Sequence, residues 1–398
     1  MGLSILLWRG WQPAFRDGLT FSTVAEMGVG GTEMQMLWHA SHLVALGHQV
    51  QILGAGPRTL EERGVEFIGT ATRAAQETAI SKGQVRPPDI VFLEGAYHAA
   101  RFFRDTYPRA RIVHVGQNID VGADRAAFAQ RDWVDAYAFV GEGHLADYSA
   151  RYPRLRGKFV LVRNAIPWSE FHSRVVPRPV EEKVIWVGSW NKKGLRKWCE
   201  VMHDAMRERP SLRWSLCGPK YGTNSHPLPS HLTAGLTLPW ERIAVSCLPL
   251  TELLEEISSA RVIIVSLGNE CGPGSVLDAH AMGRPVISGN DLVYAFSNPN
   301  GTGLRVTQRE EATAALGHLL DRPDAGDAMG RAGRAFVLRN YHEDRQREDL
   351  RGLIDYLQLD DRSRLLSQVP GTSQGEQIRQ DFCDKVGRKF RTWRIIRR

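Results

Sequence analysis

Short apolar runs alternate with longer stretches of helical periodicity along most of this chain, and they do so in two series. The first series of predicted strands is Leu3–Leu7, Val50–Leu53, Ile90–Leu93, Ile112–Val115, Ala136–Val140 and Phe159–Val162. The second is Val184–Val187, Leu212–Cys217, Ala244–Leu248, Val262–Val265, Pro285–Ser288 and Leu304–Val306. Such alternation favours an α/β architecture with parallel sheets. Prolines in residues 164–179 interrupt both ladder and helix, so we expect two sheets.

The chain has 398 residues, which is enough for two domains of about 150 to 200 residues each. We predict two Rossmann-like, doubly wound domains that face each other across a cleft. The predicted bounds are 1–168 and 169–338 for these domains, 339–358 for a C-terminal helix that packs back on the first, and 359–398 for a linker and basic tail. The five cysteines include no C-x-x-C pair, so neither a zinc knuckle nor a disulfide framework is indicated.

The net positive charge of the chain comes entirely from its C-terminal segment. Residues 362–398 hold ten Lys or Arg and three acids, which accounts for the whole net charge of +7. The preceding 361 residues, with 41 basic and 41 acidic side chains, are neutral. This distribution argues against a globally basic nucleic-acid-binding protein. Within the tail, Lys385–Arg398 has apolar side chains at helical spacing between basic ones, as in a helix that lies on an anionic membrane surface. A nucleic-acid-binding arm or a disordered solubilising end is the alternative.

A glycine pair precedes the first long predicted helix, Thr32–Leu46. The segment Gly28–Glu33 reads G-V-G-G-T-E, whereas a dinucleotide fingerprint needs glycine at the last position and a strand directly before it. We therefore exclude nicotinamide binding. The small residues Gly30 and Gly31 suit the approach of an anionic group to backbone N–H donors at a helix N-terminus. A capped loop without a ligand is the alternative.

A stronger signal follows the apolar run Val262–Val265. Here Glu270 lies in a loop, and Asp278 lies about one turn into a helix that we expect to begin near Gly274 and Ser275. Two carboxylates would then flank a helix N-terminus. This arrangement suits a nucleotide sugar, whose phosphate oxygens accept from free N–H groups and whose hydroxyls donate to carboxylates. A loop acid and a solvated helix residue are the alternatives.

This stretch resembles the E-x7-E element of the retaining family-4 glycosyltransferases of the GT-B fold. Seven residues separate Glu270 from Asp278, and Ala281–Ile287 then reads A-M-G-R-P-V-I. Four further segments resemble motifs of that family and occur in the same order. They are Gly30–Glu33 (G-G-x-E), Ala45–Val50 (G-H-x-V), Asn164–Ile166 (N-G-V) and Val187–Gly188 with Lys193–Gly194 (G-R…K-G). The resemblance covers about residues 1–357.

The resemblance implies transfer of a sugar, with retention, from a nucleoside diphosphate to an acceptor hydroxyl in polysaccharide, glycolipid or other glycoconjugate biosynthesis. It assigns Glu270 to the transferred sugar, Asp278 to the ribose and Lys193 to the pyrophosphate, where a positive charge stabilises the leaving group. The backbone at Gly274 and Ser275 would bind the phosphates. No metal or other cofactor is expected, since the chain has no Asp-x-Asp motif.

The expected partners are a nucleotide-sugar donor, a carbohydrate or lipid-linked acceptor and, through Lys385–Arg398, an anionic membrane surface. No specific nucleic acid is expected. The expected location is the cytoplasm, peripheral on the inner face of the membrane.

Three positions depart from the family pattern. Ser189 stands in the predicted phosphate loop where arginine is usual, and Asp278 replaces the second Glu. Gln117 stands where the family often has His near the reacting carbon, and it can position groups or stabilise charge but cannot act as an acid or base. Two alternatives therefore stay open: a non-catalytic GT-B binding or scaffold subunit, and a nucleic-acid-binding protein that uses the basic tail.

Overall fold

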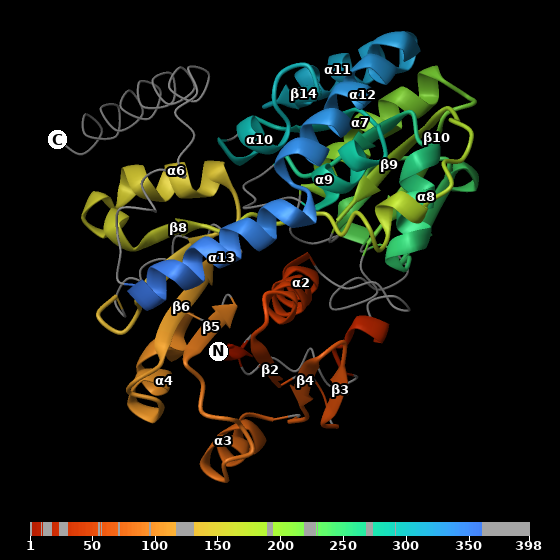
Figure 1. The fold of residues 1–398 in the computed structure, drawn as a ribbon. Coiled ribbons are helices and arrows are strands. Elements are labelled where there is room, and N and C mark those ends of the chain that lie inside the picture. Colours follow the sequence, from red (N-terminus) through yellow and green to blue (C-terminus); the bar gives the residue numbers. More distant parts are fainter. Residues whose placement is uncertain are drawn as a thin grey trace, which may run out of the picture.

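The computed structural model contains two α/β halves, each built on its own sheet (Figure 1). The structure describes residues 2–8, 10, 18–23, 31–54, 56, 58–70, 72–94, 97–116, 131–188, 194–218, 228, 230–267, 274–290 and 292–359.

The first sheet lies in the N-terminal half. Within the described residues it has eight strands in the order β3-β4-β2-β1-β5-β6-β7-β8. Their bounds are β1 Ser4–Trp8, β2 Gln49–Leu53, β3 Leu60–Glu62, β4 Val65–Ile68, β5 Ile90–Glu94, β6 Arg111–Gly116, β7 Ala136–Phe139 and β8 Phe159–Leu161. The helices are α2 Gly31–Ala45, α3 Arg73–Ser81, α4 Ala100–Thr106 and α6 Glu142–Arg151. The strand order reverses between β1 and β5, as in a doubly wound fold.

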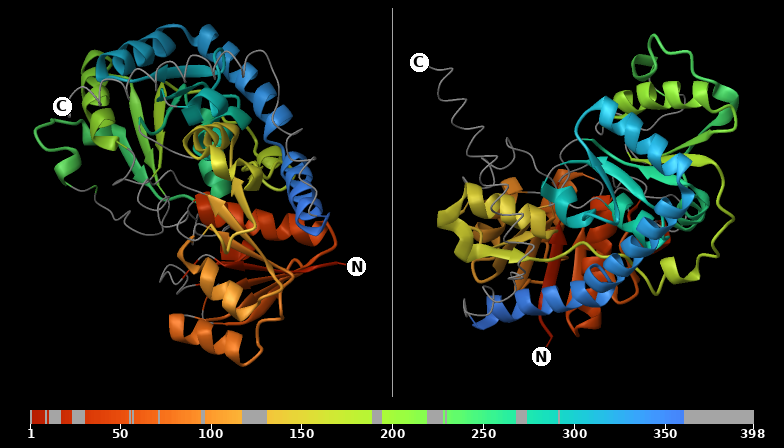
Figure 2. Two further views of the ribbon diagram at one scale, coloured as in Figure 1. Left: turned by 90° about the vertical axis from the view of Figure 1, so that its left-hand side faces the viewer. Right: turned by 90° about the horizontal axis from the view of Figure 1, so that it is seen from above.

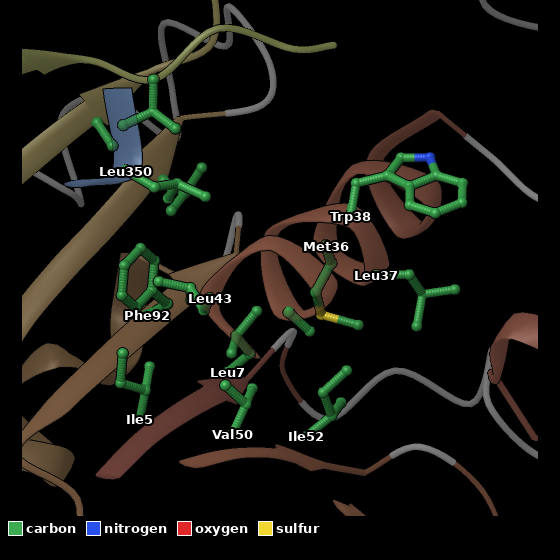
Figure 3. Packing of buried hydrophobic residues seen from close by; sticks show 14 of the residues in the cluster. Ile5, Leu7, Met36, Leu37, Trp38, Leu43, Val50, Ile52, Phe92 and Leu350 are labelled. Carbon is green, nitrogen blue, oxygen red and sulfur yellow. The ribbon is translucent and has the colours of Figure 1, made fainter. Parts of the chain in front are cut away.

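Both faces of this sheet are buried. Successive side chains of a strand point to opposite faces, so each strand contributes to two cores. Ile5 and Leu7 of β1 pack in one core with Met36 and Leu43 of α2 (Figure 3). The alternate residues of β1 pack in a second core with helices α3, α4 and α6. The apolar runs of the sequence are therefore strands covered by helices on both sides.

The second sheet lies in the C-terminal half. Its strands among the described residues are ordered β11-β10-β9-β12-β13-β14. Their bounds are β9 Lys183–Val187, β10 Arg213–Cys217, β11 Ile243–Ser246, β12 Val262–Ile264, β13 Val286–Gly289 and β14 Gly303–Val306. The helices are α7 Leu195–Glu208, α8 Leu250–Ser259, α9 Gly274–Ala281, α10 Leu292–Ser297, α11 Arg309–Asp321 and α12 Pro323–Asn340. All five strand pairings in this sheet are parallel.

Helix α7 illustrates how local pattern determines packing in this half. The predicted face Leu195, Trp198, Met202, Ala205 and Met206 is buried in the core that includes Trp186 and Trp214 of the sheet. On the opposite face of the sheet, α8 and α9 contribute Ile257, Val276 and Ala279 to a separate core. This second sheet is thus also doubly wound.

Two segments cross between the halves and lie side by side. The first is the proline-containing segment 164–179, and the second joins α12 to α13 Glu343–Leu359. The Ile166 N–H donates to the Tyr341 carbonyl at 2.9 Å, and Ile166 and His342 form an isolated β-bridge. Helix α13 then packs on α2 (Figures 1 and 2). Its Leu350 and Leu353 belong to the first core.

The β3–β4 hairpin at the edge of the first sheet was not predicted from the sequence. Strands β3 and β4 pair antiparallel, whereas we expected parallel sheets throughout. The turn between them consists of Arg63 and Gly64, with φ of 54° and 75°. Two positive φ angles are typical of a tight hairpin turn, but arginine rarely adopts this conformation and so gives no sequence signal.

Candidate functional site

Strands β9 and β12 lie side by side at the point where the order of the second sheet reverses. Because they are parallel, their carboxyl ends lie at the same edge of the sheet. In the sequence, Lys193 follows β9 and Glu270 follows β12. Ligands of doubly wound folds bind outside the carboxyl ends of the strands at such a reversal. The two strands that precede the predicted motifs of the second half thus end at the expected binding edge.

Helix α9 begins at this edge, and its start at Gly274 confirms the predicted helix. Its Val276, Leu277 and Ala279 are buried, whereas Gly274, Ser275 and Asp278 are partly exposed. A Cβ atom added at Gly274 would meet no described atom within 4 Å. The first N–H groups of a helix have no partner within it, and they carry partial positive charge. The exposed face of α9 therefore combines N–H donors with a carboxylate one turn away.

The Asp278 carboxylate has a hydrogen-bond partner from outside its helix. Nε2 of His172 lies 2.8 Å from Asp278 Oδ1, and since an ionised carboxylate only accepts, the ring donates. The His172 side chain is fully buried, and that of Asp278 is 18% exposed. His172 belongs to the crossing segment 164–179. One member of the candidate site is thus tied to the segment between the two sheets.

The opposite end of α9 is closed by packing. Gly283 adopts φ 71° just after the helix and its N–H donates to the His280 carbonyl at 2.9 Å. A left-handed glycine here ends the helix without strain. Burial lowers the pKa of His280 to about 4, so this histidine is neutral near pH 7. Within the described residues, the N-terminal end of α9 is thus the end that a ligand can approach.

In the first half, Gly31 is the first residue of α2. It is exposed, and a Cβ atom added to it would meet no described atom within 4 Å. Deeper in the same helix, His39 Nδ1 lies 2.7 Å from Glu94 Oε1 at the carboxyl end of β5, and both side chains are fully buried. Strand β6, which Gln117 follows, lies next to β5. Helix α2 thus contacts the carboxyl end of β5 through the pair of His39 and Glu94.

Several predicted site residues lie outside the described residues, namely Glu270, Lys193, Gln117, Gly30 and Ser189, together with the tail Lys385–Arg398. Their roles stay predictions. The described members are Gly31 in the first half and Gly274, Ser275 and Asp278 in the second. The last three lie together on α9.

Sequence reasoning missed His172 and also Gln35 of α2. The side chain of Gln35 donates to the Ala165 carbonyl at 2.9 Å and accepts from the Ala165 N–H at 3.2 Å. Gln346 of α13 donates to the same Gln35 oxygen at 3.0 Å. No local pattern signals such contacts, because each joins residues more than a hundred positions apart.

Neither a metal site nor a membrane-spanning helix is present in the part of the chain that the structure describes. There, no group of three or more His, Cys, Asp or Glu is arranged to hold a metal ion. Likewise, none of the described helices is both long and apolar enough to span a membrane.

No family model matches the sequence, and no curated protein matches it. Solved structures do match. A sucrose-phosphate synthase from Thermosynechococcus elongatus is similar at TM-score 0.67 and 16% identity, over 90% of this chain and 100% of its own. HepE of Anabaena, in complex with UDP-glucose, is similar at TM-score 0.67 and 11% identity, over 89% and 99%. A glycosyltransferase from Rickettsia africae is similar at TM-score 0.64 and 15% identity, over 90% and 100%. The predicted fold is thus confirmed: the chain has the GT-B fold of glycosyltransferases, with two Rossmann-like domains.

Proposed function

We propose that this protein is a glycosyltransferase that moves a sugar from a nucleoside-diphosphate sugar to an acceptor hydroxyl. The observation that carries the proposal is the position of α9. Its first residue Gly274, whose added Cβ meets no described atom within 4 Å, and its partly exposed Asp278 lie beside the reversal of strand order between β9 and β12. A nucleoside diphosphate offers phosphate oxygens to the N–H donors and ribose hydroxyls to the carboxylate. The fold likeness to HepE, a structure in complex with UDP-glucose, supports a donor of this class.

In this proposal the second domain binds the donor and the first binds the acceptor. Lys193 and the first N–H groups of α9 offset the charge that develops on the leaving diphosphate, so that no metal ion is required. Glu270 accepts hydrogen bonds from the transferred sugar. Departure of the diphosphate with attack on the same face gives retention. Closure of the two domains excludes water, so that transfer outcompetes hydrolysis.

The first test is a panel of UDP-, GDP-, ADP-, CMP- and dTDP-linked sugars, assayed by thermal shift and by release of the nucleotide product. Binding to the folded state raises the midpoint of unfolding. We expect one nucleotide class to stabilise the protein and to be slowly hydrolysed without acceptor. Stabilisation without any release would favour the scaffold alternative, and no shift with any donor would contradict the proposal.

The roles proposed for Glu270 and Lys193 predict different effects when each residue is substituted. Glu270→Ala should abolish transfer while the protein still binds the donor. Lys193→Ala should weaken binding of the nucleoside diphosphate far more than binding of the nucleoside, because its proposed partner is phosphate. Isothermal titration with both ligands measures this difference. Equal losses of affinity would count against Lys193, and full transfer by Glu270→Ala would count against Glu270.

The tail suggests that the acceptor is lipid-linked or lies at a membrane surface. Lys385–Arg398 carries seven basic residues and no acid. A chain truncated after Glu376 should lose sedimentation with anionic vesicles but retain transfer to a soluble acceptor analogue. Unchanged sedimentation of the truncated chain would reject this part of the proposal.

A further inference from the structure

The crossing segment 164–179 supplies a buried side chain to the proposed donor site. His172 donates from Nε2 to Asp278 Oδ1 over 2.8 Å, although the two residues are 106 positions apart. Among the described residues, His172 is the only side chain with a hydrogen bond or ion pair to this carboxylate. One carboxylate oxygen is therefore engaged by His172, and no side chain among the described residues bonds to the other.

The imidazole of His172 is held on several sides. Its Nδ1 lies 3.3 Å from the Pro167 carbonyl, and its ring stacks on Trp168 with centroids 6.4 Å apart and planes inclined by 21°. Arg334 of α12 lies over the other ring of this stack, 5.2 Å from the Trp168 centroid. A fully buried ring with these contacts has little freedom to turn. It can thus define one orientation for the carboxylate that it contacts.

The segment around His172 is anchored to both halves of the molecule. Phe171 packs edge-on against Trp38 of α2, with ring centroids 5.9 Å apart. Ser169 hydrogen-bonds to Glu343 at the start of α13. His172 itself reaches α9. The orientation of Asp278 is therefore set by the crossing segment and not by α9 alone.

We propose that His172 is a positioning residue for nucleotide recognition. It fixes Asp278 so that the second carboxylate oxygen accepts from a single ribose hydroxyl of the donor. This inference rests on the proposed function, because it takes a nucleotide as the ligand of α9. It goes beyond that function by assigning ribose selectivity to a residue of the crossing segment that does not touch the ligand.

Two substitutions of His172 separate positioning from mere packing. Glutamine places its side-chain N–H₂ near the position of Nε2 and can still donate to Asp278. Asparagine is one methylene shorter, so its amide lies near Nδ1 and reaches Pro167 but not Asp278. The two variants are similar in polarity and differ mainly in the contact that matters. His144→Gln, which replaces a buried histidine of α6 in the first half, is the matched control.

The measurement is the affinity of the full chain for UDP and for its 2′-deoxy and 3′-deoxy forms, with GDP and ADP and their deoxy forms in parallel. A hydrogen bond to a charged group corresponds to roughly 10- to 100-fold in affinity. We expect the natural chain, His172→Gln and His144→Gln to prefer the ribonucleotide over one deoxy form by about 10-fold or more. In His172→Asn and Asp278→Ala this preference should fall below about 3-fold, with the affinity for that deoxy form little changed.

The results distinguish a failure of the proposed function from a failure of the positioning role alone. If the natural chain binds none of these nucleotides, the proposed function fails and the inference fails with it. If it binds them and His172→Asn keeps the ribose preference, or loses affinity for both forms equally, only the positioning role is overturned. Should His172→Asn not fold, His172→Leu serves as the variant without a donor. Loss of the preference in folded His172→Gln would also contradict the proposal.

Discussion

Arg163 is a single residue that joins three parts of the chain. From the end of β8 its Nε donates to Glu142 Oε1 of α6 and its Nη1 to Asp349 Oδ1 of α13, both at 2.7 Å. The three side chains are only 15%, 16% and 7% exposed. Buried charges of this kind are costly unless they remain paired. Arg163 therefore permits α13 to pack on the first half, because it pairs with the buried Asp349 of that helix.

We expect Arg163→Met to lower the free energy of unfolding by about 3 to 5 kcal/mol, because two buried carboxylates lose the guanidinium that is paired with them. Arg73→Met is the matched control. Its ion pair with Glu77 is exposed and should contribute at most about 0.5 kcal/mol. Urea unfolding of both variants measures the contrast. Similar losses in the two would show that Arg163 does not hold α13 in place.

At the scale of elements, the candidate site depends on how closely α12 approaches α9. A Cβ atom added at Gly330 of α12 would lie 2.0 Å from the carbonyl oxygen of Gly283, just after α9. One added at Gly333 would lie 2.4 Å from Nδ1 of His280. Both distances are far below van der Waals contact. The glycines of α12 thus permit a close helix contact that positions α9.

Gly330→Ala should destabilise the protein by about 1 to 3 kcal/mol, because backbone atoms must move to admit the methyl group. Gly317→Ala in α11 is the matched control, since its added Cβ meets no described atom within 4 Å. Alanine favours a helix over glycine by about 0.5 to 1 kcal/mol, so this variant should be more stable than the natural chain. Thermal unfolding compares them. If both variants raised the midpoint of thermal unfolding equally, α9 and α12 would pack less closely than described.

At the scale of the whole molecule, both halves bury histidines in a neutral form. Burial lowers the pKa of His42, His114 and His280 to about 4 and that of His144 to about 3, from 6.5. Below pH 6.5 the unfolded chain binds protons at these sites while the folded chain does not. A depressed pKa of a base therefore favours unfolding as the pH falls. The effect extends from about pH 6.5 down to the folded-state values.

We expect the free energy of unfolding to be nearly constant above pH 7 and to fall steeply between pH 6.5 and 4. Each of these histidines should account for about 1 kcal/mol at pH 5.5. His144→Phe keeps an aromatic ring against Phe139 and Tyr148 but removes one titrating group. Its stability should therefore fall less steeply with pH. An unchanged slope in urea titrations across this range would contradict a buried neutral His144.

Most of the fold follows from local pattern. Each predicted apolar run is a strand, with ends that differ by one or two residues, and the face of α7 is buried as its spacing predicts. Strands buried on both faces need a continuous apolar run, which is visible without knowledge of their neighbours. The β3–β4 hairpin differs because Leu60 is 39% exposed and its turn has Arg63 at φ 54°. Distant contacts of Arg63 with Glu170 and Phe21 stabilise it instead.

The sequence by itself therefore determined the two doubly wound sheets, the start of α9 and the position of Asp278 about one turn into this helix. Only the tertiary structure decided that His172 contacts Asp278, that Gln35 holds Ala165 and that Arg163 joins α6 to α13. Apolar periodicity is a local property, since each strand or helix must bury one face wherever it packs. A hydrogen bond forms only within about 3 Å, and which distant residues come that close depends on how the two halves meet.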